Sequence, residues 1–169
     1  LRAGEILGIA GVAGNGQTEL LDVLGGIAPG SGRLRLAGRE LPVAGRGADG
    51  RARRAAGIAH VPEDRQSRGL VMDFAAWENL ALGYHHAPEY QRNALMMDNA
   101  AIVADCARRM AAFDVRPPDP GLAARSFSGG NQQKLVVARE PGRAPALLIA
   151  AQPTRGVDIG AIEFIHRQI

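Results

Sequence analysis

Several features that identify common protein classes are rare or absent in this sequence. Its 169 residues include one cysteine, Cys106, so no disulfide can form within the chain, a composition typical of reducing compartments. The longest apolar run, Ala146 to Ala151, is far shorter than the roughly 20 residues that a membrane-spanning helix needs. The first residues lack the basic and then apolar segments of a signal peptide. These observations argue against disulfide-rich, membrane-spanning and signal-bearing proteins.

Lysine is almost absent as well. Of the 20 basic residues, 19 are arginine, and Lys134 is the only lysine, so a mechanism that needs lysine has one candidate. The 17 acidic residues leave a formal net charge of +3, which is too small and dispersed to indicate a nucleic-acid partner. With 46% hydrophobic and 22% charged residues, the composition predicts one globular domain, or one domain with an insertion.

The first part of the chain predicts alternating short strands and helices. The apolar run from Ile6 to Ala10 predicts a buried strand, and leucines at helical spacing predict a helix from Thr18 to Leu24. Alternating apolar residues between Ser31 and Leu41 predict a hairpin or edge strands. A further strand is expected from Ile58 to Val61, where Pro62 ends it.

Residues 70–125 have a different pattern, which predicts a mostly helical subdomain. An apolar stripe at helical spacing predicts a core face, made of Ile102, Cys106, Met110 and Phe113. Beyond this segment, a helix is expected from about Asn131 to Glu140, and Pro141 ends it. A last strand is expected from Ala146 to Ala151.

A glycine-rich segment near the N-terminus has the spacing of a phosphate-binding loop, with glutamine in place of the lysine. Its residues are Gly11, Val12, Ala13, Gly14, Asn15, Gly16, Gln17 and Thr18. Glycines let backbone N–H groups turn toward a phosphate, and the Thr18 hydroxyl would be a magnesium ligand. A glycine-rich turn without a ligand explains this segment equally well. A dinucleotide-binding turn would need a third glycine where Glu19 stands.

A second pair of motifs lies in the last third of the chain. Residues 126–134 closely resemble the signature motif of ATP-binding cassette (ABC) proteins, in which the signature residues are Ser128, Gly129, Gly130, Asn131 and Gln132. Residues 145–158 resemble the Walker B strand and the D-loop of the same family, with Gly156, Val157 and Asp158 in the D-loop. The segment from His60 to Arg65 narrows the resemblance to the second, C-terminal cassette of the tandem ATP-binding subunits of simple-sugar and nucleoside importers.

The resemblance implies an α/β fold of the P-loop NTPase type. Its core has a largely parallel sheet and an inserted helical subdomain. The expected boundaries are 1–69 for the first part of the core, 70–125 for the helical subdomain, and 126–169 for the signature helix, Walker B strand and D-loop. By comparison with a whole cassette of the family, we expect the chain to be a fragment of a longer subunit.

The chain departs from the working pattern of the family at four positions. Gln17 replaces the loop lysine, and a charge-assisted hydrogen bond of ~1.5–3 kcal/mol is lost with it. Ala151 and Gln152 replace the Walker B aspartate and the catalytic glutamate, so a carboxylate near magnesium and a general base are both missing. Glu63 stands in the coupling loop where the family has glutamine. This site is therefore expected to bind nucleotide loosely and to hydrolyse it poorly or not at all.

The intact signature implies a role for the chain outside its own site. By resemblance, two cassettes pack head to tail, and this signature would serve ATP held by a partner cassette, expected in the same polypeptide. The other implied partners are membrane permease subunits and, indirectly, a periplasmic or lipid-anchored binding protein, with no nucleic acid. The expected cofactors are ATP and magnesium, and we expect magnesium binding at this site to be weak or absent.

The implied location is the cytoplasmic face of the inner membrane, where the subunit would be peripheral, while the fragment itself would be soluble. Whether this half is an enzyme is left open. A non-catalytic regulatory or scaffold cassette and a soluble ABC ATPase unrelated to transport are the alternatives.

Overall fold

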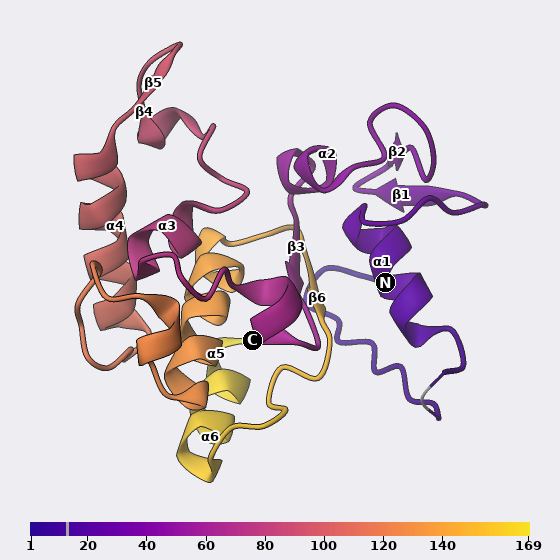
Figure 1. Cartoon of the computed structure of the whole chain (residues 1–169). Helices are drawn as coiled ribbons and strands as arrows, with labels where there is room; N and C mark the ends of the chain where they lie inside the picture. The colour runs from indigo at the N-terminus through magenta and orange to yellow at the C-terminus, as the bar shows by residue number, and fades with distance from the viewer. Residues whose placement is uncertain (13) are drawn as a thin grey trace.

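The computed structural model describes residues 1–12 and 14–169 and centres on a pair of parallel strands (Figure 1). β3 (Ile58–Val61) pairs in parallel with β6 (Leu147–Ala150), so that Val61 lies opposite Ala150. The two strands lie between two groups of elements, one built from the N-terminal third of the chain and one that is mostly helical (Figure 1). This parallel pair agrees with the α/β class that the sequence predicts.

The N-terminal group contains two helices and one hairpin. α1 (Gln17–Gly25) ends at Gly26, which has a left-handed φ of 71°. β1 (Leu34–Leu36) pairs with β2 (Arg39–Leu41) in antiparallel fashion, and α2 (Gly50–Ala55) follows. The group packs on the central strands through a small apolar cluster of Leu41, Ile58 and Ile149. The predicted helix and hairpin are both confirmed.

The helical group forms the larger core. It consists of α3 (Ala76–Ala81), α4 (Asn99–Ala112), α5 (Gly129–Arg139) and α6 (Ile159–Gln168). The predicted stripe from Ile102 to Phe113 is buried, and its C-terminal part packs in one cluster with the apolar face of α5. α5 ends before Pro141, as the sequence predicts. Within the ranges that the structure describes, no helix is both long and apolar enough to cross a membrane.

Short elements complete the chain, and one of them was not predicted. They are the π-helical turn η1 (Arg65–Gly69) and the 3₁₀ turns η2 (Pro88–Tyr90), η3 (Ala124–Ser126) and η4 (Pro141–Arg143). The unpredicted element is a hairpin of β4 (Gln91–Asn93) and β5 (Met96–Met97), which projects from the helical group (Figure 1). The Asn93 side-chain oxygen accepts from the N–H groups of Leu95 and Met96, which closes this turn locally.

The predicted buried strand from Ile6 to Ala10 is wrong. These residues form no strand, and the Ile6 side chain is 89% exposed. A short apolar run favours burial, but a strand also requires an edge to which its backbone can hydrogen-bond. In the described structure β6 pairs with β3 alone.

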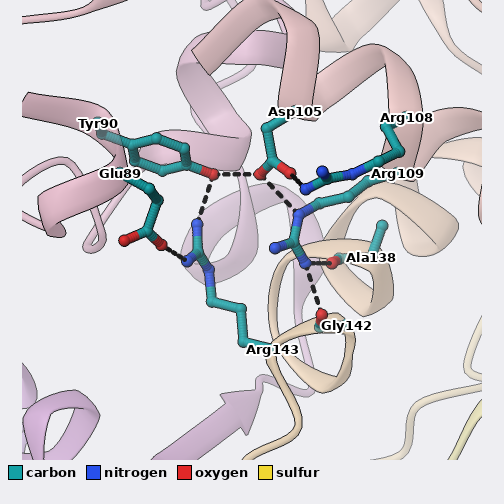
Figure 2. Close-up of polar contacts among 8 residues, drawn as sticks. All are labelled: Glu89, Tyr90, Asp105, Arg108, Arg109, Ala138, Gly142 and Arg143. Atoms are coloured by element: carbon teal, nitrogen blue, oxygen red, sulfur yellow. Dashed lines mark hydrogen bonds and ion pairs between the residues drawn. The ribbon is translucent and has the colours of Figure 1, made fainter. Parts of the chain in front are cut away.

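A polar network joins the helical subdomain to the turn after α5 (Figure 2). The Tyr90 hydroxyl donates to the Asp105 carboxylate and accepts from Arg143, whose Nη2 lies 2.6 Å away. Arg109 donates from Nε to Asp105 at 2.8 Å and from Nη1 to the Gly142 carbonyl at 2.8 Å. The network therefore fixes α4 against η4, which leads directly into β6.

Candidate functional site

The candidate site lies at the carboxyl ends of β3 and β6. Because the two strands are parallel, the segments that follow them emerge at the same edge of the sheet. Pro62 and Glu63 follow β3, and Ala151 and Gln152 follow β6. The Ala151 N–H donates to the Val61 carbonyl at 2.9 Å, which holds the two exits together.

A cavity of about 280 Å³ lies between this sheet edge and α1. Three residues from separate motifs line it: Thr18 at the start of α1, Glu63 after β3 and Ala151 after β6. Asp22, Asp64 and Arg155 are also in its wall. The fold thus brings together one residue each from the segments assigned to the phosphate loop, the coupling loop and Walker B, whereas Gln17 and Gln152 do not line this cavity.

The glycine-rich loop leads directly into α1. Gly14 and Gly16 have φ values of 87° and 94°, in the left-handed region that glycine tolerates. The Gln17 amide donates from Nε2 to the Val12 carbonyl at 3.1 Å. A Cβ at Gly11 would lie 2.1 Å from the same nitrogen, so the loop closes tightly around Gln17. Ala13, also assigned to this loop, lies outside the described residues.

The Walker B end of the site contains no free carboxylate. Ala151 is buried, and its methyl group offers no metal ligand. Gln152 has a φ of 44°, and its Nε2 donates to Glu63 Oε1 at 3.2 Å. Arg155 forms an ion pair with the same Glu63 carboxylate. The carboxylate that contacts the Walker B end therefore comes from the β3 side and is already paired.

The other two acidic residues in the cavity wall have partners of their own. Asp22 pairs with Arg68 at 2.6 Å. The Asp64 side chain accepts from the N–H groups of Ser67 and Gln66, and these bonds hold the pKa of Asp64 below its usual value. In residues 1–12 and 14–169, no three or more His, Cys, Asp or Glu side chains are grouped so that they could hold a metal ion.

The signature segment forms the start of α5. Ser128 is its N-cap, and the exposed Ser128 Oγ accepts from the Asn131 N–H at 3.4 Å and from Asn131 Nδ2 at 2.9 Å. Gly129 and Gly130 occupy the first turn. Gln132 is turned inward: its Nε2 donates to the carbonyls of Ala124 and Phe127, and 4% of the residue is exposed. Ser128 is thus exposed, whereas Gly130 is buried and Gln132 supports the helix from inside.

Arg65 joins the D-loop segment to this site, a link that the sequence analysis missed. Its Nη1 donates to the Arg155 carbonyl at 2.9 Å and its Nη2 to the Gly156 carbonyl at 3.2 Å. A Cβ at Gly129 would lie 2.7 Å from Arg65 Nη2 and 3.4 Å from the Gly156 oxygen. The start of α5, η1 and the D-loop segment therefore pack closely. Just beyond Gly156 and Val157, Asp158 caps α6 by accepting from the Ala161 N–H at 2.9 Å.

Curated import proteins are similar to the chain over its whole length. It is 44% identical over 171 residues to the guanosine import ATP-binding protein NupO of Bacillus subtilis strain 168. It is 41% identical over 172 residues to the nucleoside import ATP-binding protein NupA of Lactococcus lactis subsp. cremoris strain MG1363. The xylose import ATP-binding protein XylG of Burkholderia ambifaria is 41% identical over 173 residues. These matches cover 100% of the chain, which spans about a third of each relative's length.

A solved ABC cassette has the same fold. The dimeric structure of the bacterial ABC transporter cassette MJ0796 matches with a TM-score of 0.76 and 21% identity, over 99% of this chain and 68% of that one. A second structure of that cassette, bound to ADP and Pi, gives a TM-score of 0.71 over 93% of this chain and 64% of that one. Residues 1–155 match the family model described as ABC transporter, so the chain belongs to the ABC transporter family.

Proposed function

We propose that this chain is the nucleotide-binding cassette of an importer for simple sugars or nucleosides, with a degenerate site of its own. In this proposal its signature completes the ATP site of a partner cassette. The observation that carries the proposal is the contrast between the signature segment and the residues of the chain's own nucleotide site. Ser128 is exposed at the capped start of α5, while Gln17, Ala151 and Gln152 stand where the family pattern has the loop lysine, the magnesium carboxylate and the general base.

The cavity residues support weak nucleotide binding and little hydrolysis. The Gln17 amide is bonded to its own loop, so it adds no positive charge toward a phosphate. Thr18 supplies one hydroxyl for magnesium, but Ala151 has no oxygen ligand at the position where the family has a carboxylate. The residues present therefore do not fit a magnesium site of the usual family type.

The signature side supports a role in trans. The first turn of α5 carries backbone N–H groups that no earlier helical turn can bond, and the helix dipole adds partial positive charge there. Because Gly129 and Gly130 have no side chains, Arg65 and Asp158 of this chain pack closely against the first turn of α5. A phosphate group of a facing cassette would approach the N–H groups along the helix axis, at the N-terminal end of α5. The Ser128 hydroxyl is exposed beside them.

The partners in the proposal follow from the relatives. Those relatives are named as import ATP-binding proteins and are about three times as long as this chain, which leaves room for a second cassette in one polypeptide. This chain would be the C-terminal cassette, with domain boundaries at 1–69, 70–125 and 126–169. The complex would include permease subunits, receive substrate from a binding protein, and lie on the cytoplasmic face of the inner membrane.

The test compares two substitutions in the full-length subunit assembled with its permease. Ser128→Arg should lower ATP hydrolysis by about 100-fold, the size of effect known for loss of a transition-state donor. Thr18→Ala, in the degenerate site, should lower it by less than about threefold. Ser126→Arg is the matched control, because Ser126 is exposed two residues before the signature serine.

The results of these tests distinguish the proposed arrangement from its two alternatives. Equal losses for Ser128→Arg and Thr18→Ala, or a larger loss for Thr18→Ala, would contradict the arrangement. If none of the variants changes hydrolysis and calorimetry detects no ATP binding, the chain is a scaffold cassette. Hydrolysis that needs no permease and is unchanged by it would favour a soluble ATPase.

A further inference from the structure

A second cavity, of about 90 Å³, lies between the end of α1, α2 and β3. Its wall includes Gly25, Gly50 and Ile58, which are absent from the larger cavity. The two cavities share three residues, His60, Pro62 and Arg68, so they are neighbours. The small cavity is strongly basic, because four arginines line it together with His60: Arg53, Arg54, Arg68 and Arg139.

Of these four arginines, Arg53 is the most deeply buried, and it has no acidic partner in the described part of the chain. It is 2% exposed, and it donates from Nε to the Leu24 carbonyl at 3.1 Å and from Nη2 to the Pro42 carbonyl at 2.5 Å. Among the residues that the structure describes, no carboxylate pairs with this guanidinium, and its buried Nη1 has no hydrogen-bond partner. A buried guanidinium without a counter-charge is costly unless an anion offsets it.

The charges around the cavity do not balance. Arg54 and Arg139 share one carboxylate, that of Glu140, at 3.4 and 2.9 Å. Arg68 pairs with Asp22 at 2.6 Å. Four guanidinium groups thus face two carboxylates. One uncompensated positive charge lies at Arg53, and a second is shared by Arg54 and Arg139, which have only Glu140 between them. Buried Arg54 Nε, which also has no partner in the described part of the chain, adds a second free donor.

His60 completes the wall from β3. Its Nε2 is buried and has no partner within residues 1–12 and 14–169. Burial lowers the pKa of His60, and Arg54 and Arg68 lower it further against the opposing effect of Glu140 and Asp22. The ring is therefore neutral at pH 7 and can donate from one nitrogen. A Cβ at Gly25 would lie 3.0 Å from Nδ1, so the ring is packed against the end of α1.

We propose that this cavity is a binding site for a small oxyanion of the size of inorganic phosphate. Its volume of about 90 Å³ corresponds to about three water molecules, which suits a tetrahedral oxyanion and is too small for a nucleoside. Arg53, Arg54 and His60 line it from two elements, α2 and β3, and each has a buried nitrogen without a partner in the described part of the chain. The bound anion would neutralise Arg53 and tie α1, α2 and β3 together beside the larger cavity.

The test is thermal unfolding of the full-length protein in potassium phosphate, with potassium chloride at the same ionic strength as reference. Phosphate should raise the Tm by at least about 2 °C more than chloride, because an anion that binds only the folded state stabilises it. Sulfate, which has the same shape, should act similarly. Arg68→Gln and Arg53→Lys should each raise the phosphate concentration at half-effect by about tenfold or more.

Control variants identify the site. Arg33→Gln removes an exposed arginine elsewhere and should leave the phosphate response unchanged. Thr18→Ala and Ser128→Arg should also keep it, because they alter the glycine-rich loop and the signature. Arg68 is suited to this test because its side chain is 45% exposed, so folding does not depend on its burial.

A second measurement does not depend on stability. Phosphate should raise the pKa of His60 in an NMR titration, since a nearby negative charge favours the imidazolium form. The proposal is overturned if phosphate and chloride act alike, if Arg68→Gln keeps the wild-type midpoint, or if the His60 pKa does not move. A response lost only in Thr18→Ala would assign the phosphate to the glycine-rich loop and would equally overturn it.

Discussion

The Gln152 amide donates to the Glu63 carboxylate, with Nε2 and Oε1 3.2 Å apart, and this contact joins the segments that follow β6 and β3. In the family pattern that the chain resembles, glutamine stands in the loop after the first of these strands and glutamate follows the second. Here the two residue types are exchanged, with Glu63 after β3 and Gln152 after β6. The Glu63 carboxylate is also paired with Arg155. Both partners of the Glu63 carboxylate therefore come from the segment that follows β6.

The Glu63–Gln152 contact leads to a prediction for Gln152→Glu. The substitution places two carboxylates face to face at a partly exposed position, so we expect a loss of up to about 1 kcal/mol in unfolding free energy. It should not restore ATP hydrolysis, because Gln17 and Ala151 remain and such groups act as a unit. Urea unfolding and a phosphate-release assay measure both. Gln168→Glu, exposed on α6, is the control, and turnover near ~1 s⁻¹ would contradict the prediction.

Glu140 carries a second prediction, on stability. It is fully buried and bonds Arg139 at 2.9 Å, Arg54 at 3.4 Å and the Tyr84 hydroxyl at 2.8 Å. Glu140→Gln leaves two guanidinium groups without their counter-charge, so we expect a loss of about 3–5 kcal/mol in chemical denaturation. The control Glu163→Gln breaks an exposed pair with Arg167 and should cost about 1 kcal/mol or less. Similar losses in both variants would refute this difference.

The same residue predicts a pH dependence. Burial raises the pKa of Glu140, but attraction to Arg139 and Arg54 outweighs it, so the pKa in the folded protein lies below the ordinary value of 4.5. The stability that this carboxylate contributes is therefore complete above about pH 4.5 and is lost as the pH falls through the folded-state pKa. Denaturation series at several acidic pH values should show a flatter acid decline for Glu140→Gln than for the wild type.

Local signals in the sequence predicted the elements that carry the site. Ser128 caps α5 and Pro141 ends it, while Gly26 ends α1, and each of these effects acts within a few residues. The resemblance to the family implied that the phosphate loop, the coupling loop and Walker B lie near one another, and one residue from each, Thr18, Glu63 and Ala151, lines the same cavity. The apolar run predicted a strand from Ala146 to Ala151, and β6 spans Leu147–Ala150, so Ala151 lies just after the strand and not at its end.

The contacts between distant segments could not be predicted. Arg65 bonds a carbonyl 91 residues further along the chain, and no periodicity links the two. No pattern in the sequence marks Arg53 for burial, but the fold buries it against the Leu24 and Pro42 carbonyls. The strand predicted from Ile6 to Ala10 is wrong for a related reason, because apolar residues alone do not specify the strand with which they would pair.

The two tyrosines of the chain predict an unusual alkaline titration. Burial, followed by bonds to Glu140 and Asp105, raises the pKa of Tyr84 and of Tyr90 from 10 to about 12. The folded state thus favours the neutral phenols, and their contribution to stability is complete below pH 10 and is lost as the pH rises through 12. Phenolate absorbance should appear near pH 12 in native protein and near pH 10 in urea. Tyr84→Phe and Tyr90→Phe assign each step; a native midpoint near 10 would contradict the prediction.

Arg65 is predicted to hold the D-loop segment through its fork of two donors. Nη1 and Nη2 reach the Arg155 and Gly156 carbonyls at 2.9 and 3.2 Å, a geometry that a single lysine ammonium cannot reproduce. Arg65→Lys should therefore speed amide hydrogen exchange over residues 155–158 by up to about tenfold, the equivalent of one lost hydrogen bond. Arg33→Lys, at an exposed position, should not change it. Exchange that stays at the wild-type rate in Arg65→Lys would mean that the packing of Gly129 against Gly156, and not the guanidinium, positions this segment.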